Sequence, residues 1–114
     1  MTVVEPEFVR VSARGKYSFQ DMFDFVDRVK LEADNTERFR VLMDCREYDG
    51  HMTEAERFMG GQKIAEVLGS RLRAALLLPT AEVTKLGELA AVNRGAKLLV
   101  TDSEAEAMEW LLSP

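Results

Sequence analysis

The sequence predicts an α/β fold: a single small domain with a mixed, largely parallel sheet of four to five strands and about four helices. Three observations predict it. The length of 114 residues fits one domain. A composition of 46% hydrophobic and 31% charged residues is typical of a chain with a packed core and a polar surface. Short apolar strand patterns alternate with amphipathic helical patterns, and this alternation calls for parallel strands joined by right-handed crossovers.

The first strand is expected at residues 8–14, where apolar and polar side chains alternate strictly. Pro6 has no backbone N–H, so any pairing by Val3 and Val4 lies at a sheet edge or across a break. A helix over about 18–33 follows. Its apolar stripe is Phe19, Met22, Phe23, Val26 and Val29. Because one face of the first strand is polar, we expect the helices mostly on its other face, with the polar face open to solvent or a partner.

The second strand is expected at residues 39–45, and Thr53 with Glu56 forms a capping box for a helix over about 54–69. The side chains on one face of this strand are Phe39, Val41, Met43 and Cys45. The predicted buried stripe of the helix is Phe58, Gly61, Ile64, Ala65 and Leu68. We interpret Gly61 as the point where this helix closely approaches the sheet.

The last third of the chain contains its most apolar run, residues 72–78, which predicts a central strand buried on both faces. A helix over about 81–93 follows and ends near Gly95, a residue suited to the left-handed stop position. A strand at 97–101 and a helix that begins after Ser103 complete the fold. The inward side chains of that last helix are Ala107, Met108, Leu111 and Leu112.

The charge balance and the cysteine content exclude several classes of function. Twenty acidic against fifteen basic residues give a net charge of −5, which argues against binding to a nucleic-acid backbone. The single cysteine excludes an internal disulfide and suits a reducing cytosol. No apolar run approaches the roughly 18 residues that a membrane span needs, and the first residues lack a signal-peptide pattern. We therefore expect a cytoplasmic protein with neither a nucleic-acid partner nor a membrane span.

The densest group of functional side chains surrounds the loop after the second strand: Asp44, Arg46, Tyr48, His51 and Thr53. It lies beyond the carboxyl end of a strand and before a helix N-terminus, where α/β folds place ligands. Arg46, His51 and the helix N–H groups offer donors to a carboxylate or a phosphate of a ligand or partner. The competing interpretation is a solvated loop in which Asp44 pairs locally with Arg46.

The candidates for catalysis and metal binding are weaker. Cys45 has only His51 as a potential base, and no residue orients that imidazole, so a small buried hydrophobe is the better interpretation of the cysteine. The spacing of Asp44, Asp49 and His51 matches no metal motif. No strand-to-helix turn carries a glycine-rich phosphate motif. We expect no enzymatic activity, no metal and no cofactor.

Four segments carry a family resemblance: GKYSFQDMFDFVDRV (15–29), VLMDCREYDG (41–50), RAALLLP (73–79) and AAVNRGAKLLVTDSEAEAMEWL (90–111). In this order and length they resemble the SpoIIAA-like family of STAS-type domains, whose fold is shared with a group of lipid-exchange proteins. The resemblance implies a small mixed sheet with flanking helices and no catalytic machinery.

Regulatory members of that family carry a phosphorylatable serine in an Asp-Ser-Ser-Gly stretch. The matching residues of this chain are Asp44, Cys45, Arg46 and Glu47, so only the aspartate agrees and the acceptor position has no hydroxyl. This departure counts against a phosphoserine switch, whereas protein binding through the same surface stays compatible with the sequence.

Two functional hypotheses follow. The first is a non-enzymatic interaction module that binds a protein partner, or a second copy of the chain as a homodimer, through the open sheet face or the 44–53 loop. It is motivated by apolar residues off the core stripes: Phe25, Leu31, Tyr48 and Trp110. The alternative is a carrier or sensor of a small apolar or lipid-like ligand, held between the sheet and the helices at 18–33 and 81–93.

Overall fold

The computed structural model describes all 114 residues and contains one five-stranded sheet. Its strands are β1 (Thr2–Val4), β2 (Val9–Lys16), β3 (Arg40–Asp49), β4 (Arg73–Leu77) and β5 (Lys97–Thr101). They lie side by side in the order in which they occur in the chain. β1 pairs antiparallel with β2, and every later pair is parallel. The mixed, mostly parallel sheet confirms the predicted fold class.

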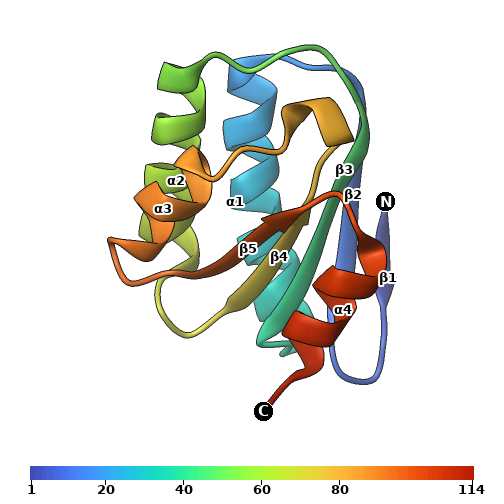
Figure 1. Ribbon diagram of the computed structural model, residues 1–114. Helices are drawn as coiled ribbons and strands as arrows, with labels where there is room; N and C mark the ends of the chain where they lie inside the picture. The colour runs from blue at the N-terminus through green and yellow to red at the C-terminus, as the bar shows by residue number, and fades with distance from the viewer.

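Four α-helices flank this sheet on two sides. They are α1 (Phe19–Thr36), α2 (Glu54–Leu68), α3 (Leu86–Val92) and α4 (Glu104–Leu112), and a 3₁₀ turn, η1 (Thr80–Glu82), precedes α3. Helices α1, α2 and α3 cover one face of the sheet, and α4 lies on the other (Figure 1). Three right-handed crossovers that advance in the same direction place their helices on the same face. Helix α4 follows the last strand, so this constraint does not apply to it.

The two faces of the sheet carry separate cores. The larger core lies under α1, α2 and α3 and includes Val11, Met43 and Leu76. The smaller core lies under α4. Its members are Phe8, Leu42, Ala75, Leu77, Ala107 and Leu111. Side chains of β4 enter both cores in alternation, which confirms that the apolar run at 72–78 is a central strand buried on both faces.

Three expectations about the elements were wrong. The helix expected over 81–93 is divided into η1 and the shorter α3. The second strand continues to Asp49, because β2 pairs with β3 beyond a register shift, up to the pair Lys16 and Asp49. The polar face of β2 is not fully open, since Arg10 reaches Glu104 of α4.

Helix α2 begins with the predicted capping box of Thr53 and Glu56, but its buried stripe differs from the expected one. Phe58 is 41% exposed, whereas Arg57 is buried. A Cβ at Gly61 would collide with the carbonyl oxygen of Gly87 in α3. The close approach at Gly61 is therefore to α3 and not to the sheet.

Some apolar residues also differ from expectation. Phe25 is buried in the larger core instead of lying on a flank, and Phe39 is 56% exposed just before β3. In α4, Ala107 and Leu111 are buried as expected, but Leu112 is exposed. None of the helices combines the length and apolar character needed to cross a membrane.

Candidate functional site

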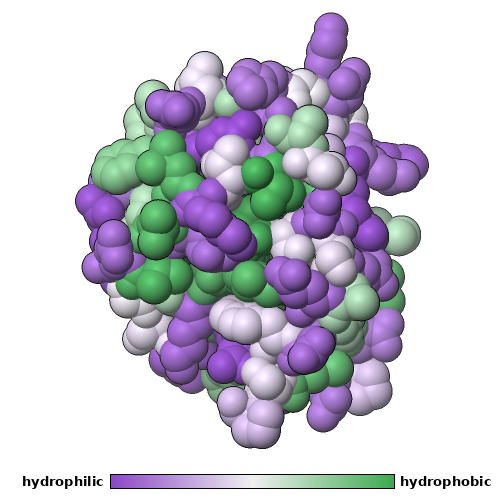
Figure 2. Space-filling view, in the orientation of Figure 1, coloured by the Kyte–Doolittle hydropathy of each residue, from purple (hydrophilic) through white to green (hydrophobic).

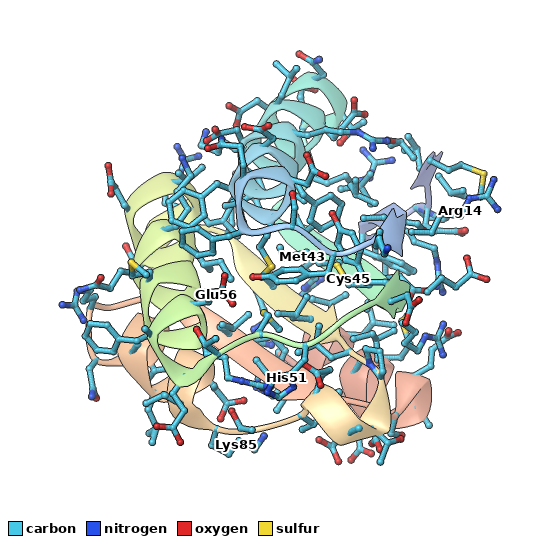
Figure 3. All side chains as sticks on the ribbon, turned by 90° about the horizontal axis from the view of Figure 1, so that it is seen from above. Arg14, Met43, Cys45, His51, Glu56 and Lys85 are labelled. Carbon is cyan, nitrogen blue, oxygen red and sulfur yellow. The ribbon has the colours of Figure 1, made fainter.

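The structure divides the predicted site residues among three places. Asp44 and Arg46 lie beside α4, because alternate residues of a strand face opposite sides of the sheet. Tyr48 has the same parity as Asp44 and Arg46 along β3, yet it packs against the larger core on the other face. The pairing of β3 with β2 shifts register between Ser12 and Arg14, and this shift reverses the alternation before Tyr48. His51 and Thr53 lie between the end of β3 and α2, at the carboxyl edge of the sheet. Figure 3 looks down on this edge and shows His51 on the side of α2, far from Arg14 of β2.

Asp44 and Arg46 belong to a four-membered ion network with Arg10 and Glu104. The Nη2 atom of Arg46 lies 2.8 Å from Asp44 Oδ2 and 2.8 Å from Glu104 Oε1. Arg10 contacts the same two carboxylates at 3.1 and 3.2 Å. Two guanidinium groups thus face two carboxylates, and the network carries no net charge.

The hydrogen bonds of this network stabilise its charged forms. The Arg46 side chain lowers the pKa of Asp44 despite partial burial, which acts in the opposite direction. The Arg10 side chain, followed by that of Arg46, lowers the pKa of Glu104. Asp44 and Glu104 therefore stay ionised near neutral pH with their oxygens engaged inside the chain. The Nε and Nη2 atoms of Arg46 already donate to these carboxylates, so an external anion would compete with them for this guanidinium.

His51 belongs to a second group, centred on Glu82 of η1. Oε1 of Glu82 accepts hydrogen bonds from the backbone N–H of Met52 at 2.9 Å and from Arg57 Nη2 at 3.0 Å. Oε2 lies 2.9 Å from His51 Nδ1. Burial alone would raise the pKa of Glu82, but the Met52 N–H and His51 outweigh it and hold that pKa below its usual value.

Glu82 and Arg57 were not among the site residues predicted from the sequence. Each is at least nine-tenths buried, and they are separated by 25 residues. Arg57 had one detectable signal: it stands at the helical position that faces the core, one residue before Phe58. Charged residues are almost never fully buried without a partner. If Arg57 is assigned to the buried face of α2, an acidic side chain is therefore expected beside it. No local pattern identifies Glu82 as that acid.

Thr53 serves the helix itself. Its Oγ1 accepts from the Glu56 N–H at 3.1 Å, and Glu56 Oε1 accepts from the Thr53 N–H at 2.9 Å. These reciprocal bonds satisfy two of the donors that the start of α2 would otherwise offer to an anion. The side chain of His51 is 75% exposed. It is therefore accessible to an external ligand.

Tyr48 contacts Tyr17 edge to face, with ring centroids 6.0 Å apart. The Tyr17 hydroxyl is buried without a hydrogen-bond partner. Burial, and secondarily the charge of Glu56, raises the pKa of Tyr17 to about 12. A cavity of about 10 Å³ lies between these rings and Glu82, which is at the lower limit of the space that one water molecule needs.

Cys45 is a residue of β3 and is fully buried in the larger core. Figure 3 labels it next to Met43. Burial and the neighbouring charge of Asp44 raise the pKa of its thiol, so Cys45 is protonated at neutral pH. A protonated, enclosed thiol packs as a small apolar group. No group of three or more His, Cys, Asp and Glu side chains is arranged to hold a metal ion.

A further small pocket lies between α2, α3 and the sheet, with a volume of about 30 Å³. Apolar side chains such as Ile64 and Leu98 form most of its wall, and Arg57 and Glu82 border it at one end. This is where the sequence placed an apolar ligand. Pockets that hold drug-sized ligands usually measure about 300–1,000 Å³.

No protein-family model and no curated protein matches this chain.

Proposed function

We propose that this chain is a cytoplasmic, non-enzymatic interaction module resembling the STAS-type domains, and that it binds a protein partner or a second copy of itself. The observation that carries the proposal is an apolar surface that we call the α3 ridge: Phe58, Leu86, Leu89 and Val92. These side chains are 37–55% exposed. Figure 2 shows hydrophobic side chains gathered on the face of the molecule that includes α3.

Helix α3 has the reverse of the pattern found in most surface helices. Its inward residues are small, with Ala90 and Ala91 buried, while Leu86, Leu89 and Val92 are exposed. A surface helix normally directs large apolar side chains to the core and polar ones to water. An outward apolar row, spaced every three residues along one helix, favours a protein contact over solvent.

The charges beside the ridge are engaged within the chain. The Arg94 guanidinium lies 5.5 Å from the centre of the Phe58 ring and donates to the carbonyl oxygen of Ala90. Lys85 pairs with Glu88 at 3.2 Å. The ridge therefore offers apolar contact without a strong charge of either sign, which suits the same surface on a second copy or an apolar helix of a partner.

The 44–53 loop is less suited to this role, because the side chains of Arg46 and His51 already contact Glu104 and Glu82. Binding at Asp44, Arg46, Tyr48, His51 and Thr53 stays a prediction, as does the carrier function. The cavity of about 30 Å³ under α3 would have to expand roughly ten-fold before it reached the lower end of the usual pocket range. The geometry therefore favours the interaction module.

The test compares two leucine substitutions of similar exposure. Leu89 on α3 and Leu31 on α1 are 55% and 56% exposed, so Leu89→Glu and Leu31→Glu add the same charge on different surfaces. Sedimentation measures self-association, and cross-linking in the native cell with mass spectrometry identifies partners. We expect Leu89→Glu to abolish the association found with the unaltered chain, and Leu31→Glu to preserve it. Equal association by both variants would refute the role of the ridge.

A further inference from the structure

The outer edge of β5 is occupied by two side chains of its own chain. Oε1 of Glu88 accepts a hydrogen bond from the backbone N–H of Val100 at 2.7 Å. Nζ of Lys85 donates to the Val100 carbonyl oxygen at 2.8 Å. The same Nζ lies 3.2 Å from Glu88 Oε1, so the two side chains also pair with each other. Both backbone groups of Val100 are thus engaged as a neighbouring strand would engage them.

The sheet register shows why these groups are available. The carbonyl oxygen of Thr101 accepts from Leu78 N at 3.1 Å and therefore faces β4. Residues of a strand alternate in the direction of their backbone hydrogen bonds. Leu99 and Thr101 accordingly bond toward β4, while Leu98 and Val100 direct their N–H and C=O groups away from the sheet.

We propose that Lys85 and Glu88 form an edge guard that prevents β5 from pairing with β5 of a second copy. The outward N–H and C=O groups of Leu98 and Val100 can bond to the same groups of a second copy. The two β5 strands would then run antiparallel, with the two-fold axis at Leu99. In that register Leu98 of each copy lies opposite Val100 of the other, and each such pair exchanges two hydrogen bonds. Every one of these bonds involves a Val100, so occupying this single residue blocks them all.

Exposed strand edges promote association, and proteins commonly cover or charge them. In this chain the covering groups come from the beginning of α3, next to the α3 ridge. The guard thereby separates two ways of associating: contacts through the side chains of the ridge stay available, and addition of a strand at β5 does not. This inference does not depend on the ridge being an interface.

The first test removes the guard and measures self-association. Lys85→Ala with Glu88→Ala is compared with Lys30→Ala with Asp34→Ala, which removes an exposed ion pair of α1 far from β5. Both double variants also carry Leu89→Glu, so that the α3 ridge does not contribute to self-association. We expect the association constant from sedimentation to rise at least ten-fold when the guard is removed and to stay unchanged in the control. No rise in the guard variant overturns the proposal.

Cysteine cross-linking tests the register in the guard-free chain. In the proposed pair the two copies of Leu99 face each other with Cα atoms about 4.5 Å apart, within disulfide range. The two copies of Lys97 lie several residues out of register. Leu99→Cys should therefore form a disulfide-linked dimer on mild oxidation and Lys97→Cys should not. Equal cross-linking by both, or by neither, overturns the proposal.

Two further measurements keep the inference testable if the double alanine variant folds poorly. Glu88→Gln retains an acceptor oxygen for the Val100 N–H. In the Leu89→Glu background it should therefore leave the association constant unchanged. Glu88→Ala alone should make the Val100 amide exchange its hydrogen at least ten-fold faster at low protein concentration, where no dimer forms. Unchanged exchange of that amide would show that the guard does not hold the edge.

Discussion

Arg57 and Glu82 form an ion pair inside the protein, with 3.0 Å between Nη2 and Oε1. Their exposed fractions are 7% and 8%. Arg57 also donates to the backbone carbonyl of Glu82, and Glu82 accepts from the Met52 N–H. The pair therefore connects the first turn of α2, the preceding loop and η1, and it holds the carboxyl edge of the sheet together.

Replacing Arg57 by alanine should lower the free energy of unfolding by about 3 kcal/mol, because it leaves a carboxylate buried without its cation. Urea denaturation followed by circular dichroism measures the change. The control is Arg28→Ala, which removes an exposed arginine whose side chain donates only to Thr2 at 3.3 Å. Its effect should stay within about 0.5 kcal/mol. Similar losses from both substitutions would contradict a special role of the buried pair.

Glu82 should make the free energy of unfolding depend on pH. Its pKa in the folded protein lies below the usual 4.5. At a pH between the lowered pKa and 4.5, the unfolded chain therefore binds more protons than the folded one. The stabilisation that ionised Glu82 adds to the folded state is therefore complete above about pH 4.5, and it is lost as the pH falls through the lowered pKa. The stability difference between the unaltered chain and Glu82→Gln should shrink from pH 7 to pH 3 in urea denaturation. The exposed Glu109→Gln serves as the comparison, and a difference independent of pH would disprove the assignment.

Gly61 and Gly60 should respond differently to the same added methyl group. A Cβ at Gly61 would collide with the Gly87 carbonyl oxygen and lie 3.0 Å from the Ala90 Cβ, whereas at Gly60 it would lie 3.7 Å from the end of Met22. Gly61→Ala should cost about 1–3 kcal/mol through overpacking, and Gly61→Leu more. Gly60→Ala should be neutral or stabilising by up to about 1 kcal/mol, because alanine favours helix. Thermal melting ranks the variants, and the reverse order would mean that α2 faces another way.

Cys45 should react with thiol reagents only when the protein opens. It is fully buried and its thiol pKa is raised, so neither access nor thiolate is available in the folded state. Labelling with a chromogenic disulfide should be far slower in buffer than in concentrated urea. Between these limits, its rate should follow the unfolded fraction. Rapid labelling of the native protein would mean that the larger core opens locally near β3.

Features that depend on neighbours a few residues apart could be predicted from the sequence. The capping box of Thr53 and Glu56 formed as predicted, because its hydrogen bonds span three residues. The buried strand within 72–78 was also predictable, since a short apolar run bounded by a proline has few alternatives. These local signals, taken in order, were enough to establish the fold class.

Which functional groups meet could not be predicted in this way, because it depends on long-range packing. Asp44 and His51 are close in sequence, yet one lies beside α4 and the other at Glu82, because the continued pairing of β3 with β2 separates them. Arg10 meets Glu104 across 94 residues. Such pairs depend on strand order and register and on the face that α4 covers, and no interaction within a short segment determines these. The guard on β5 has the same origin: Lys85 and Glu88 form an ordinary helical pair in the sequence, and only the position of β5 beside α3 brings them to the edge of the sheet.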